Sequence, residues 1–419
     1  MCGAGCCLLP TFRGSDRTLN EKSSVTNGPS ATPLQAASPS SVFVRQGLQM
    51  TPNDPALKVL IDRVKAARSA GTQLRIRGGG SKDFYGEEPR GELLDTRGLA
   101  GVSSYEPTEL VVTARCGTLL TELEALLATH GQSLPFEPPH FGNAALQPRE
   151  RGATVGGMVA AGLSGPSRAA VGSVRDHVLG ATMLNGNGEV LTFGGQVMKN
   201  VAGYDVSRLL AGSLGTLGLI LEVSLKVMPL ASATATLRLD MDQAAALGQL
   251  NAWGGQPLPL NATAWWGGKL VVRLRGALAA VEAARARLGG ELVEPEFAAP
   301  FWDGLRNHDS EFFVNARATE GASLWRISLP STAAPLALSG EWMIEWGGAQ
   351  RWLCSEMPAF VVRDTVAKAG GHATLFAARD KSAGAFAPLS SPLDRIHREL
   401  KKAFDPAGIF NPGRLYLAL

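Results

Sequence analysis

The chain has 419 residues, of which 45% are hydrophobic and 18% are charged, and its formal net charge is +3. This is ordinary content for a globular protein of two or three domains. The mild charge, with no basic run, excludes a typical nucleic-acid-binding protein, and no apolar run approaches the roughly 20 residues that a membrane span needs.

The first residues differ in character from the rest. Residues 1–41 are rich in Ser, Thr, Pro, Asn and Gly without an apolar period, which predicts a disordered extension before order begins near Val42. Cys2, Cys6 and Cys7 lie there, either in an incidental tail or in a lipidated or metal-binding thiol cluster. The five cysteines form no regular disulfide framework, and the short apolar run beside them lacks the features of a signal peptide. We therefore expect a cytoplasmic protein.

Helix and strand signals alternate over the next stretch. Asp54 and Asp205 are expected helix caps, Thr118 is a third, and Gly71 is an expected stop. The apolar periods predict, in chain order, a helix over 54–71, strands over 73–77, 93–95 and 110–114, a helix over 118–131, a short helix over 154–162, a hairpin of strands 178–184 and 189–193, a helix over 205–210, and a strand over 219–227 with one apolar and one polar face.

Glycine clusters stand between these elements, and the first of them follows a strand directly. The run Gly78-Gly-Gly-Ser-Lys82 is either a phosphate cradle or a hairpin bend. Residues 81–86 have no helical period, so a nicotinamide-binding Rossmann turn is excluded. Lys82 either neutralises a phosphate or is a solvated loop lysine. The proline-rich segment 134–140, which includes Pro138, can form a rigid wall beside a flat ligand, and His140 in it is expected at the surface.

The pattern of predicted strands and helices changes after Pro229. The patterns predict a strand over 234–239, a helix over 242–253, a hairpin of strands 262–266 and 270–274, and a helix over 277–288. Trp265-Trp-Gly-Gly is echoed by Glu345-Trp-Gly-Gly, which suggests two related halves whose tryptophans are core residues. A helix over 394–404 carries basic residues that we interpret as a solvated face.

Several motifs, taken in order, carry a family resemblance. They are Arg77-Gly-Gly-Gly, Thr154-Val-Gly-Gly, Arg175-Asp-His-Val-Leu-Gly180, Asn200-Val-Ala-Gly-Tyr-Asp205, Gly212-Ser-Leu-Gly-Thr-Leu-Gly218 and the closing Phe404-Asp-Pro-Ala-Gly-Ile-Phe-Asn-Pro-Gly413. The order resembles the FAD-binding domain of the p-cresol methylhydroxylase and vanillyl-alcohol oxidase (PCMH-type) superfamily, and within it the FAD-binding subunits of glycolate oxidase, the GlcE type. The specific motifs cover residues 42–229 and 392–419.

This resemblance implies a fold and a division of the chain. The fold is α+β, with a two-lobed FAD-binding domain over 42–229, an inserted α+β cap over 230–391 that supplies substrate contacts, and a C-terminal segment, 392–419, that returns to the FAD domain. The cofactor is FAD. Members that attach flavin covalently often carry a histidine where this chain has Ser81-Lys82, so we expect non-covalent FAD.

The resemblance also implies which residues hold the cofactor. Backbone N–H groups of the first two glycine loops hold the pyrophosphate, two later segments line the adenine and ribityl portions, and Asn411 approaches the isoalloxazine ring. The residues expected at FAD are Arg77, Gly78, Gly79, Gly80, Ser81, Lys82, Pro138, Thr154, Val155, Gly156, Gly157, Gly172, Arg175, Asp176, Val178, Gly215, Thr216, Gly218, Ile220 and Asn411.

The activity implied is oxidation of glycolate to glyoxylate by hydride transfer to flavin. The implied partners are a second flavoprotein and an iron–sulfur subunit, through which the protein reaches the periphery of the inner membrane. Related dehydrogenases carry two histidines in a cap motif, whereas Gly370-Gly-His-Ala here has only His372, which either faces substrate or starts a buried strand. Two alternatives stay open: a free-standing oxidase of another hydroxy acid or alcohol, and an FAD-binding assembly subunit without turnover.

Overall fold

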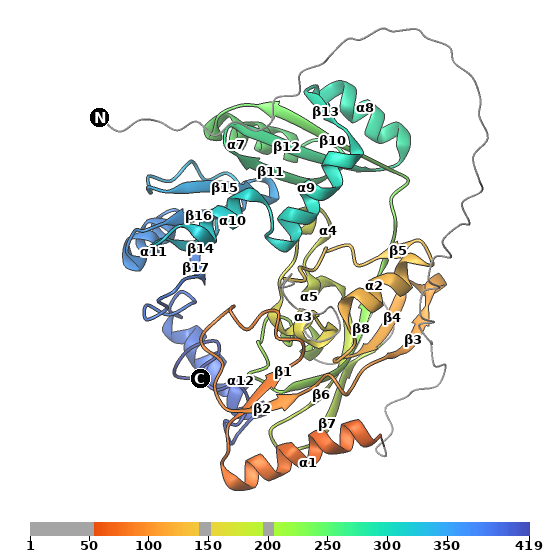
Figure 1. Ribbon diagram of the computed structural model, residues 1–419, viewed down its shortest axis with the longest axis vertical. Coiled ribbons are helices and arrows are strands. Elements are labelled where there is room, and N and C mark those ends of the chain that lie inside the picture. The colour runs from red at the N-terminus through yellow and green to blue at the C-terminus, as the bar shows by residue number, and fades with distance from the viewer. Residues whose placement is uncertain (1–53, 142–151, 196–204) are drawn as a thin grey trace, which may run out of the picture. The chain divides into compact units, whose positions relative to one another are not determined.

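The structure is a computed structural model that describes residues 54–141, 152–195 and 205–419 (Figure 1). The expectations for residues 1–41, for the start of order at Val42 and for most of the Asn200 motif lie outside these ranges. Residues 42–419 fall in one compact unit. Two large sheets occupy successive parts of it.

The first part contains a five-stranded sheet and a parallel pair of strands. The sheet order is β3-β4-β8-β6-β7, with all its neighbours antiparallel, while β1 pairs with β2. The strands are β1 (Leu74–Arg77), β2 (Glu92–Asp95), β3 (Val102–Glu106), β4 (Val111–Arg115), β6 (Val178–Leu184), β7 (Val190–Gly194) and β8 (Leu219–Lys226), and β5 (Gln132–Ser133) pairs with β9 (Met228–Pro229). The helices are α1 (Pro55–Ala70), the 3₁₀ turn η1 (Pro107–Glu109), α2 (Leu120–Ala128), α3 (Val155–Ala161), α4 (Arg168–Val171), α5 (Val174–His177) and α6 (Val206–Leu209).

Local sequence signals decide several element ends. The Asp54 carboxylate accepts the Ala56 N–H at 2.9 Å and caps α1, which ends at Gly71 with φ of 68°. Asp205 caps α6 in the same way, as predicted. The predicted cap at Thr118 is wrong: Leu119 is the N-cap of α2, because the Thr118 hydroxyl bonds the backbone of Gly101 instead, at 2.9 and 3.0 Å.

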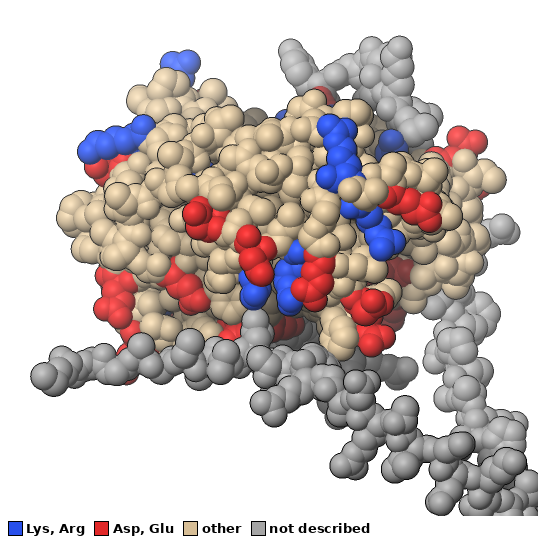
Figure 2. Space-filling view, turned by 90° about the horizontal axis from the view of Figure 1, so that it is seen from above, with Lys and Arg blue, Asp and Glu red and all other residues tan. Residues whose placement is uncertain are grey.

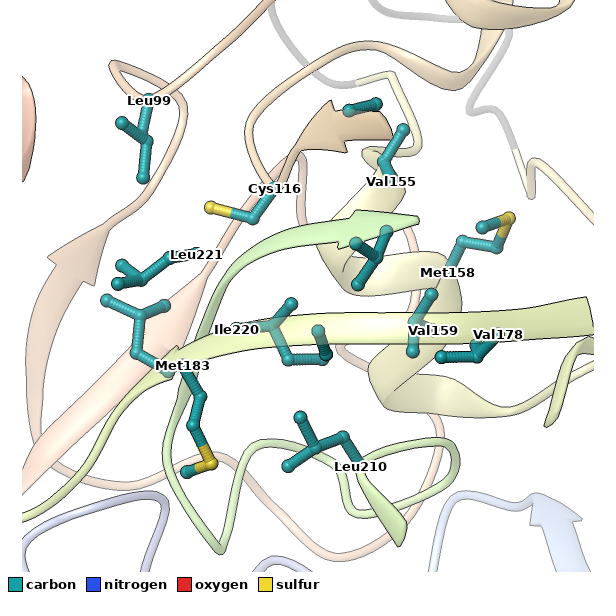
Figure 3. Packing of buried hydrophobic residues seen from close by; sticks show 14 of the residues in the cluster. Leu99, Cys116, Val155, Met158, Val159, Val178, Met183, Leu210, Ile220 and Leu221 are labelled. Atoms are coloured by element: carbon teal, nitrogen blue, oxygen red, sulfur yellow. The ribbon is translucent and has the colours of Figure 1, made fainter. Parts of the chain in front are cut away.

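Most of β8 is buried on both faces, which differs from the prediction of one polar face. β8 lies third of five in the sheet, so both of its edges are paired. Ile220 and Ser224, on the face expected to be polar, are buried, and the Ser224 hydroxyl bonds that of Thr113 at 2.8 Å. Hydrophobic residues of α3, β6 and β8 then form one core with Leu99 and Cys116 (Figure 3).

The second part is an eight-stranded antiparallel sheet with internal symmetry. Its order is β13-β10-β12-β11-β15-β16-β14-β17, so the second four strands repeat the first four in reverse order, in agreement with two related halves. The strands are β10 (Ala233–Asp240), β11 (Leu260–Trp266), β12 (Lys269–Gly276), β13 (Glu291–Val293), β14 (Ser323–Ser328), β15 (Glu341–Glu345), β16 (Gln350–Ser355) and β17 (His372–Ala377). The helices are α7 (Gln243–Gly254), α8 (Leu278–Leu288), α9 (Pro295–Asn307), α10 (Glu311–Ala318), η2 (Trp346–Gly348) and α11 (Ala359–Lys368).

The two faces of this sheet are covered differently. Helices α7 and α8 pack on one face through Leu250 and Val281, and α11 packs with the β14 and β17 side chains of the second half through Val362. Helices α9 and α10 share a separate cluster with Phe376 of β17. That cluster also contains Tyr85 and residues near Gly162 and Gly215 from the first part of the chain. It therefore joins the eight-stranded sheet to the first part.

The C-terminal segment is in contact with the first part of the chain. Helix α12 (Ser391–Phe404) leads into an extended stretch beside β1, where the Leu74 N–H donates to the Ile409 carbonyl at 2.7 Å. Lys401 is not part of a solvated face, which corrects the prediction: its ammonium is nearly buried and bonds Asp405 at 2.7 Å and two backbone carbonyls. The tail is thus tied to the core of the first part.

A buried carboxylate in the eight-stranded sheet gives a pH prediction. Burial raises the pKa of Glu345 from its ordinary 4.5 to about 6, although Trp352 and Gln350 donate to it at 2.6 and 3.0 Å. Its contribution to stability is therefore full below pH 4.5 and is lost as the pH rises through 6. Against Glu345→Gln, the wild type should lose roughly 2 kcal/mol of unfolding free energy between these limits. Urea titrations of both proteins at pH 4.5 and 8 measure this, and equal pH dependence in the two contradicts it.

The surface shows no single dominant charge on the face drawn in Figure 2, where acidic and basic side chains are interspersed. Within the described ranges, no helix is both long enough and apolar enough to cross a membrane.

Candidate functional site

A pocket opens where four separate segments meet. They are the glycine loop after β1, the first turns of α3, residues 214–220 before and at the start of β8, and the C-terminal residues Asn411 and Arg414. The space, counted to its open mouth, is about 820 Å³. Segments more than 300 residues apart in sequence thus build one site.

Most of the residues expected at the cofactor line this pocket. Those in its wall are Arg77, Gly78, Gly79, Gly80, Ser81, Lys82, Thr154, Gly156, Gly157, Gly215, Gly218, Ile220 and Asn411. Residues expected there but found outside the wall are Pro138, Val155, Gly172, Arg175, Asp176, Val178 and Thr216. Val155 and Val178 are core residues, and Asp176 closes a capping box with Ser173, so local folding explains these three. Their contact with the cofactor stays a prediction.

The first glycine loop has unused hydrogen-bond donors. Among the described residues, the backbone N–H groups from Gly78 to Lys82 donate to no protein acceptor. Consecutive free amides of this kind form a nest that binds an anion such as a pyrophosphate. In the second loop, by contrast, the Gly156 N–H donates to the Cys116 carbonyl at 2.9 Å and the Gly157 N–H to the Thr154 hydroxyl at 3.3 Å. The first loop therefore has the greater capacity for an anion.

The glycines also let the two loops approach. A Cβ added at Gly79 would lie 1.6 Å from the Gly152 carbonyl oxygen, and one at Gly78 would lie 2.2 Å from the Thr154 hydroxyl. At Gly80, φ is +74° and the added Cβ would meet the Arg77 guanidinium at 2.3 Å. The glycine run is thus required by the packing of the cradle itself.

The pocket is strongly cationic. The described residues of its wall include four basic side chains and a single carboxylate, Asp83. The basic residues are Arg75, Arg77, Lys82 and Arg414. Arg77 pairs with Asp83 at 2.7 Å. Burial, and next the charge of Arg306, lower the pKa of the Lys82 ammonium to about 7. An anionic ligand would relieve this excess of positive charge.

The loop that carries Lys82 is held from two sides. Arg414, buried, donates to the carbonyls of Lys82 and Asp83 at 3.2 and 2.9 Å. Lys381, from the segment after β17, donates to the Gly86 carbonyl at 2.8 Å. Sequence reasoning missed both residues, although Arg414 directly follows the Asn-Pro-Gly motif that had been singled out.

Asn411 lines the pocket and also holds it together. Its side-chain oxygen accepts the Ile76 N–H at 2.7 Å, and its amide nitrogen donates to the Leu214 carbonyl at 2.6 Å. The residue has φ of 41° and is buried. Asn411 therefore ties β1, the Gly215 loop and the C-terminal segment to one another, while its contact with a flavin ring remains a prediction.

Two polar clusters join the pocket-bearing part to the eight-stranded sheet. In one, Glu124 of α2 binds both Arg306 of α9 and His140, whose Nε2 is 3.0 Å away. His140 is half-buried here, which corrects the expectation of a surface histidine. In the other, Glu137 receives two bonds from Arg273, at 2.7 and 2.8 Å. Burial alone would raise the pKa of Glu137, yet Arg273 and then other donors hold it below its ordinary value.

The aromatic residues beside the loop form an apolar wall. Phe141 contacts Phe84, Phe376 and His308, and the His308 ring stacks on Phe313 with centroids 3.9 Å apart. Burial lowers the pKa of His308 well below its ordinary value, so its imidazole is neutral near pH 7. His308 gave no sequence signal, because its surroundings come from three separate elements.

The candidate His372 lies at the exposed start of β17, outside the described pocket wall. It begins a strand whose next four residues are buried, as one of its two interpretations expected. Arg379, which follows β17, is exposed and pairs with Glu320. Neither His372 nor Arg379 therefore lies in the described pocket wall.

Comparison with known proteins agrees with the geometry of the pocket. Residues 57–194 match the FAD binding domain family. The chain is also 47% identical over 362 residues to "Glycolate oxidase subunit GlcE" of Escherichia coli (strain K12), a match that covers 86% of this chain and 98% of that protein. The chain belongs to the GlcE family. It is an FAD-dependent oxidoreductase chain with the PCMH-type fold.

More distant relatives match a smaller share of the chain. A D-lactate dehydrogenase of Anaerostipes hadrus is 32% identical, and the glycolate oxidase subunit GlcD of Bacillus subtilis (strain 168) is 28% identical, each over 147 residues that make up 35% of this chain and 29% of the relative. A solved structure of alkyldihydroxyacetonephosphate synthase matches with a TM-score of 0.58 at 16% identity, covering 85% of this chain and 75% of that one, which shows a shared fold.

The pocket of this GlcE-family chain fits FAD. The amide nest and the surplus of cations match a pyrophosphate, and the wall offers no reactive group for a covalent link. Among its described residues there is no histidine, and burial raises the pKa of the Cys116 thiol in it to about 12. A thiol that stays protonated is a poor nucleophile. These observations support the prediction of dissociable FAD.

Proposed function

We propose that this chain is the FAD-binding subunit of a glycolate oxidase complex and takes part in the oxidation of glycolate to glyoxylate. The observation that carries the proposal is the 47% identity that extends over 98% of the Escherichia coli GlcE subunit. The cationic, glycine-lined pocket supports it, because it offers a place for the cofactor that the chemistry needs. Bound FAD would supply a two-electron acceptor.

The residues of the chain would then perform three tasks. The N–H groups from Gly78 to Lys82 would hold the pyrophosphate, and Asn411 would keep the C-terminal wall of the pocket in place. The aromatic wall around Phe141 would exclude water from the reacting end of the pocket. Partner subunits would take the electrons onward, because the relatives are named as subunits of glycolate oxidase. The family resemblance implies that these partners are a second flavoprotein and an iron–sulfur protein.

A flavin-reduction experiment tests this function. The full chain is purified with and without its partner subunits, glycolate is added without oxygen, and flavin absorbance near 450 nm is followed. We expect bleaching that includes the flavin of this chain within the complex. A complex rebuilt with an FAD-free variant of this chain shows how much of the bleaching belongs to the partner flavin. If glycolate leaves this chain's flavin oxidised in the complete complex, the proposed oxidation is wrong.

A further inference from the structure

Lys82 is a cation in the cofactor pocket that has no acidic partner among the described residues. Its ammonium bonds the Ser81 hydroxyl at 3.2 Å and lies 5.5 Å from the centre of the Phe141 ring. Among the described residues, no carboxylate lies within ion-pair distance of it. A lysine that is half-buried and unpaired usually signals a missing anion or a displaced proton.

The other cations around the loop are already engaged. Arg77 pairs with Asp83, Arg414 donates to two backbone carbonyls of the loop, and Arg306 binds Glu124. Arg75 shares the unpaired state of Lys82 in the described wall, with a buried Nε that meets no acceptor. Arg75 precedes the glycine loop and Lys82 ends it. The two unpaired cations therefore bracket the amide nest.

Arg75 and Lys82 lie in different surroundings. Arg75 stands in β1, inside the first part of the chain. The Lys82 side chain reaches the Phe141 ring, which belongs to the aromatic wall shared with α9 and β17. Arg306 of α9 is near enough for its charge to act on Lys82. Lys82 therefore lies on the side of the pocket that is next to the aromatic residues shared with the inserted region.

A small anion fits this side of the pocket. An ammonium without an acidic partner among the described residues, with an aromatic ring beside it, favours a ligand that carries one compact charge and little other polar surface. A lysine ammonium binds such a charge as a mobile point donor. A pyrophosphate, by contrast, is served by the amides of the loop. A short carboxylic acid combines the required charge and size.

We propose that Lys82 binds the carboxylate of the small hydroxy-acid substrate on the side of the pocket next to Phe141. This inference rests on the proposed function, since it concerns the substrate of the same site. It assigns a substrate-binding role, and no proton transfer, to Lys82. The Arg414 and Lys381 contacts to the loop then position this side chain.

Binding of a non-oxidisable anion tests the proposal without turnover. Full-length FAD-loaded chain is titrated with oxalate, and the perturbation of the flavin spectrum gives a Kd. We expect Lys82→Met to keep its FAD and to raise this Kd at least tenfold, and Lys82→Arg to restore part of the affinity. Lys58→Met makes the same change of charge on the exposed face of α1 and should leave the Kd within twofold.

Three results overturn the proposal. They are an unchanged Kd in Lys82→Met, loss of FAD from that variant, which would assign the lysine to the cofactor, and the lack of any saturable oxalate signal in the wild type. None of them depends on whether glycolate reduces the flavin. Conversely, a wild-type complex that glycolate fails to reduce, but whose oxalate binding needs Lys82, contradicts the proposed function and leaves the anion site supported.

Discussion

Gly79→Ala should lose most of its bound FAD while the rest of the chain still folds. The added Cβ would lie 1.6 Å from the Gly152 carbonyl oxygen, a backbone atom that no rotamer change can move away. The two glycine loops must therefore separate, and the amide nest from Gly78 to Lys82 loses its shape. We expect a tenfold or greater fall in the ratio of absorbance at 450 nm to that at 280 nm after purification.

Gly98→Ala is the matched control for this variant. Gly98 lies in an exposed turn, and an added Cβ there has nothing within 4 Å. It should keep wild-type FAD content and circular dichroism. Gly79→Ala with normal FAD content would show that the approach of the loops does not shape the cofactor site.

Glu137→Gln should cost about 3 kcal/mol of unfolding free energy, because it leaves the buried Arg273 charge without its partner. The Arg273 side chain is 4% exposed and bonds both Glu137 oxygens. The same carboxylate also accepts the Ser167 N–H at 3.1 Å and lies 3.4 Å from Arg275. Urea unfolding at pH 7, followed by tryptophan fluorescence, measures the loss.

Glu320→Gln is the control for the loss of an ion pair. Glu320 and Arg379 form a pair 3.4 Å apart whose side chains are 88% and 82% exposed. Exposed pairs contribute about 0.5 kcal/mol or less in most proteins, so this variant should be nearly neutral. Equal effects of Glu137→Gln and Glu320→Gln would mean that the buried cluster does not hold the two parts of the chain together.

The elements that sequence predicted well are those with local start and stop signals. Asp54 and Gly71 bound α1, and Asn185 and Gly188 stand in the turn of the β6–β7 hairpin. Helix α9 is harder to predict, because Pro300 lies inside it and breaks the usual pattern. The burial of Ile220 and Ser224 also escaped prediction, since it follows from the central place of β8 in the sheet.

The residues of the pocket also differ in how well the sequence predicted them. The glycine loop was predictable, because three consecutive glycines after a strand have few structural uses. Arg306 and Arg414 were not, since each acts through backbone or acidic groups that only the tertiary fold brings near. Arg75 was not either, since only the fold places it in the pocket wall. Thr154 was found through its motif, but the structure adds that its hydroxyl caps α3. The sequence thus located the glycine loops, whereas the charged residues around them could be identified only from the fold.

The division of the chain into four ranges stays a prediction. Each large sheet lies within one of these ranges. The five-stranded sheet lies within residues 102–226 and the eight-stranded sheet within 233–377. The Ile76 N–H donates to the Asn411 side chain, so the last segment is in contact with the first part. A truncation before α12 should therefore empty the pocket as well as shorten the chain.

The flavin content of the purified full-length chain directly tests whether this chain binds FAD without a covalent bond. After acid precipitation, flavin in the supernatant and pellet is quantified and identified by chromatography. We expect close to one FAD per chain, all of it in the supernatant, because the described residues of the pocket wall include cations and free amides but no histidine, and burial raises the pKa of the Cys116 thiol among them. A chain that purifies and refolds without taking up FAD, or one whose flavin stays in the pellet, would contradict it.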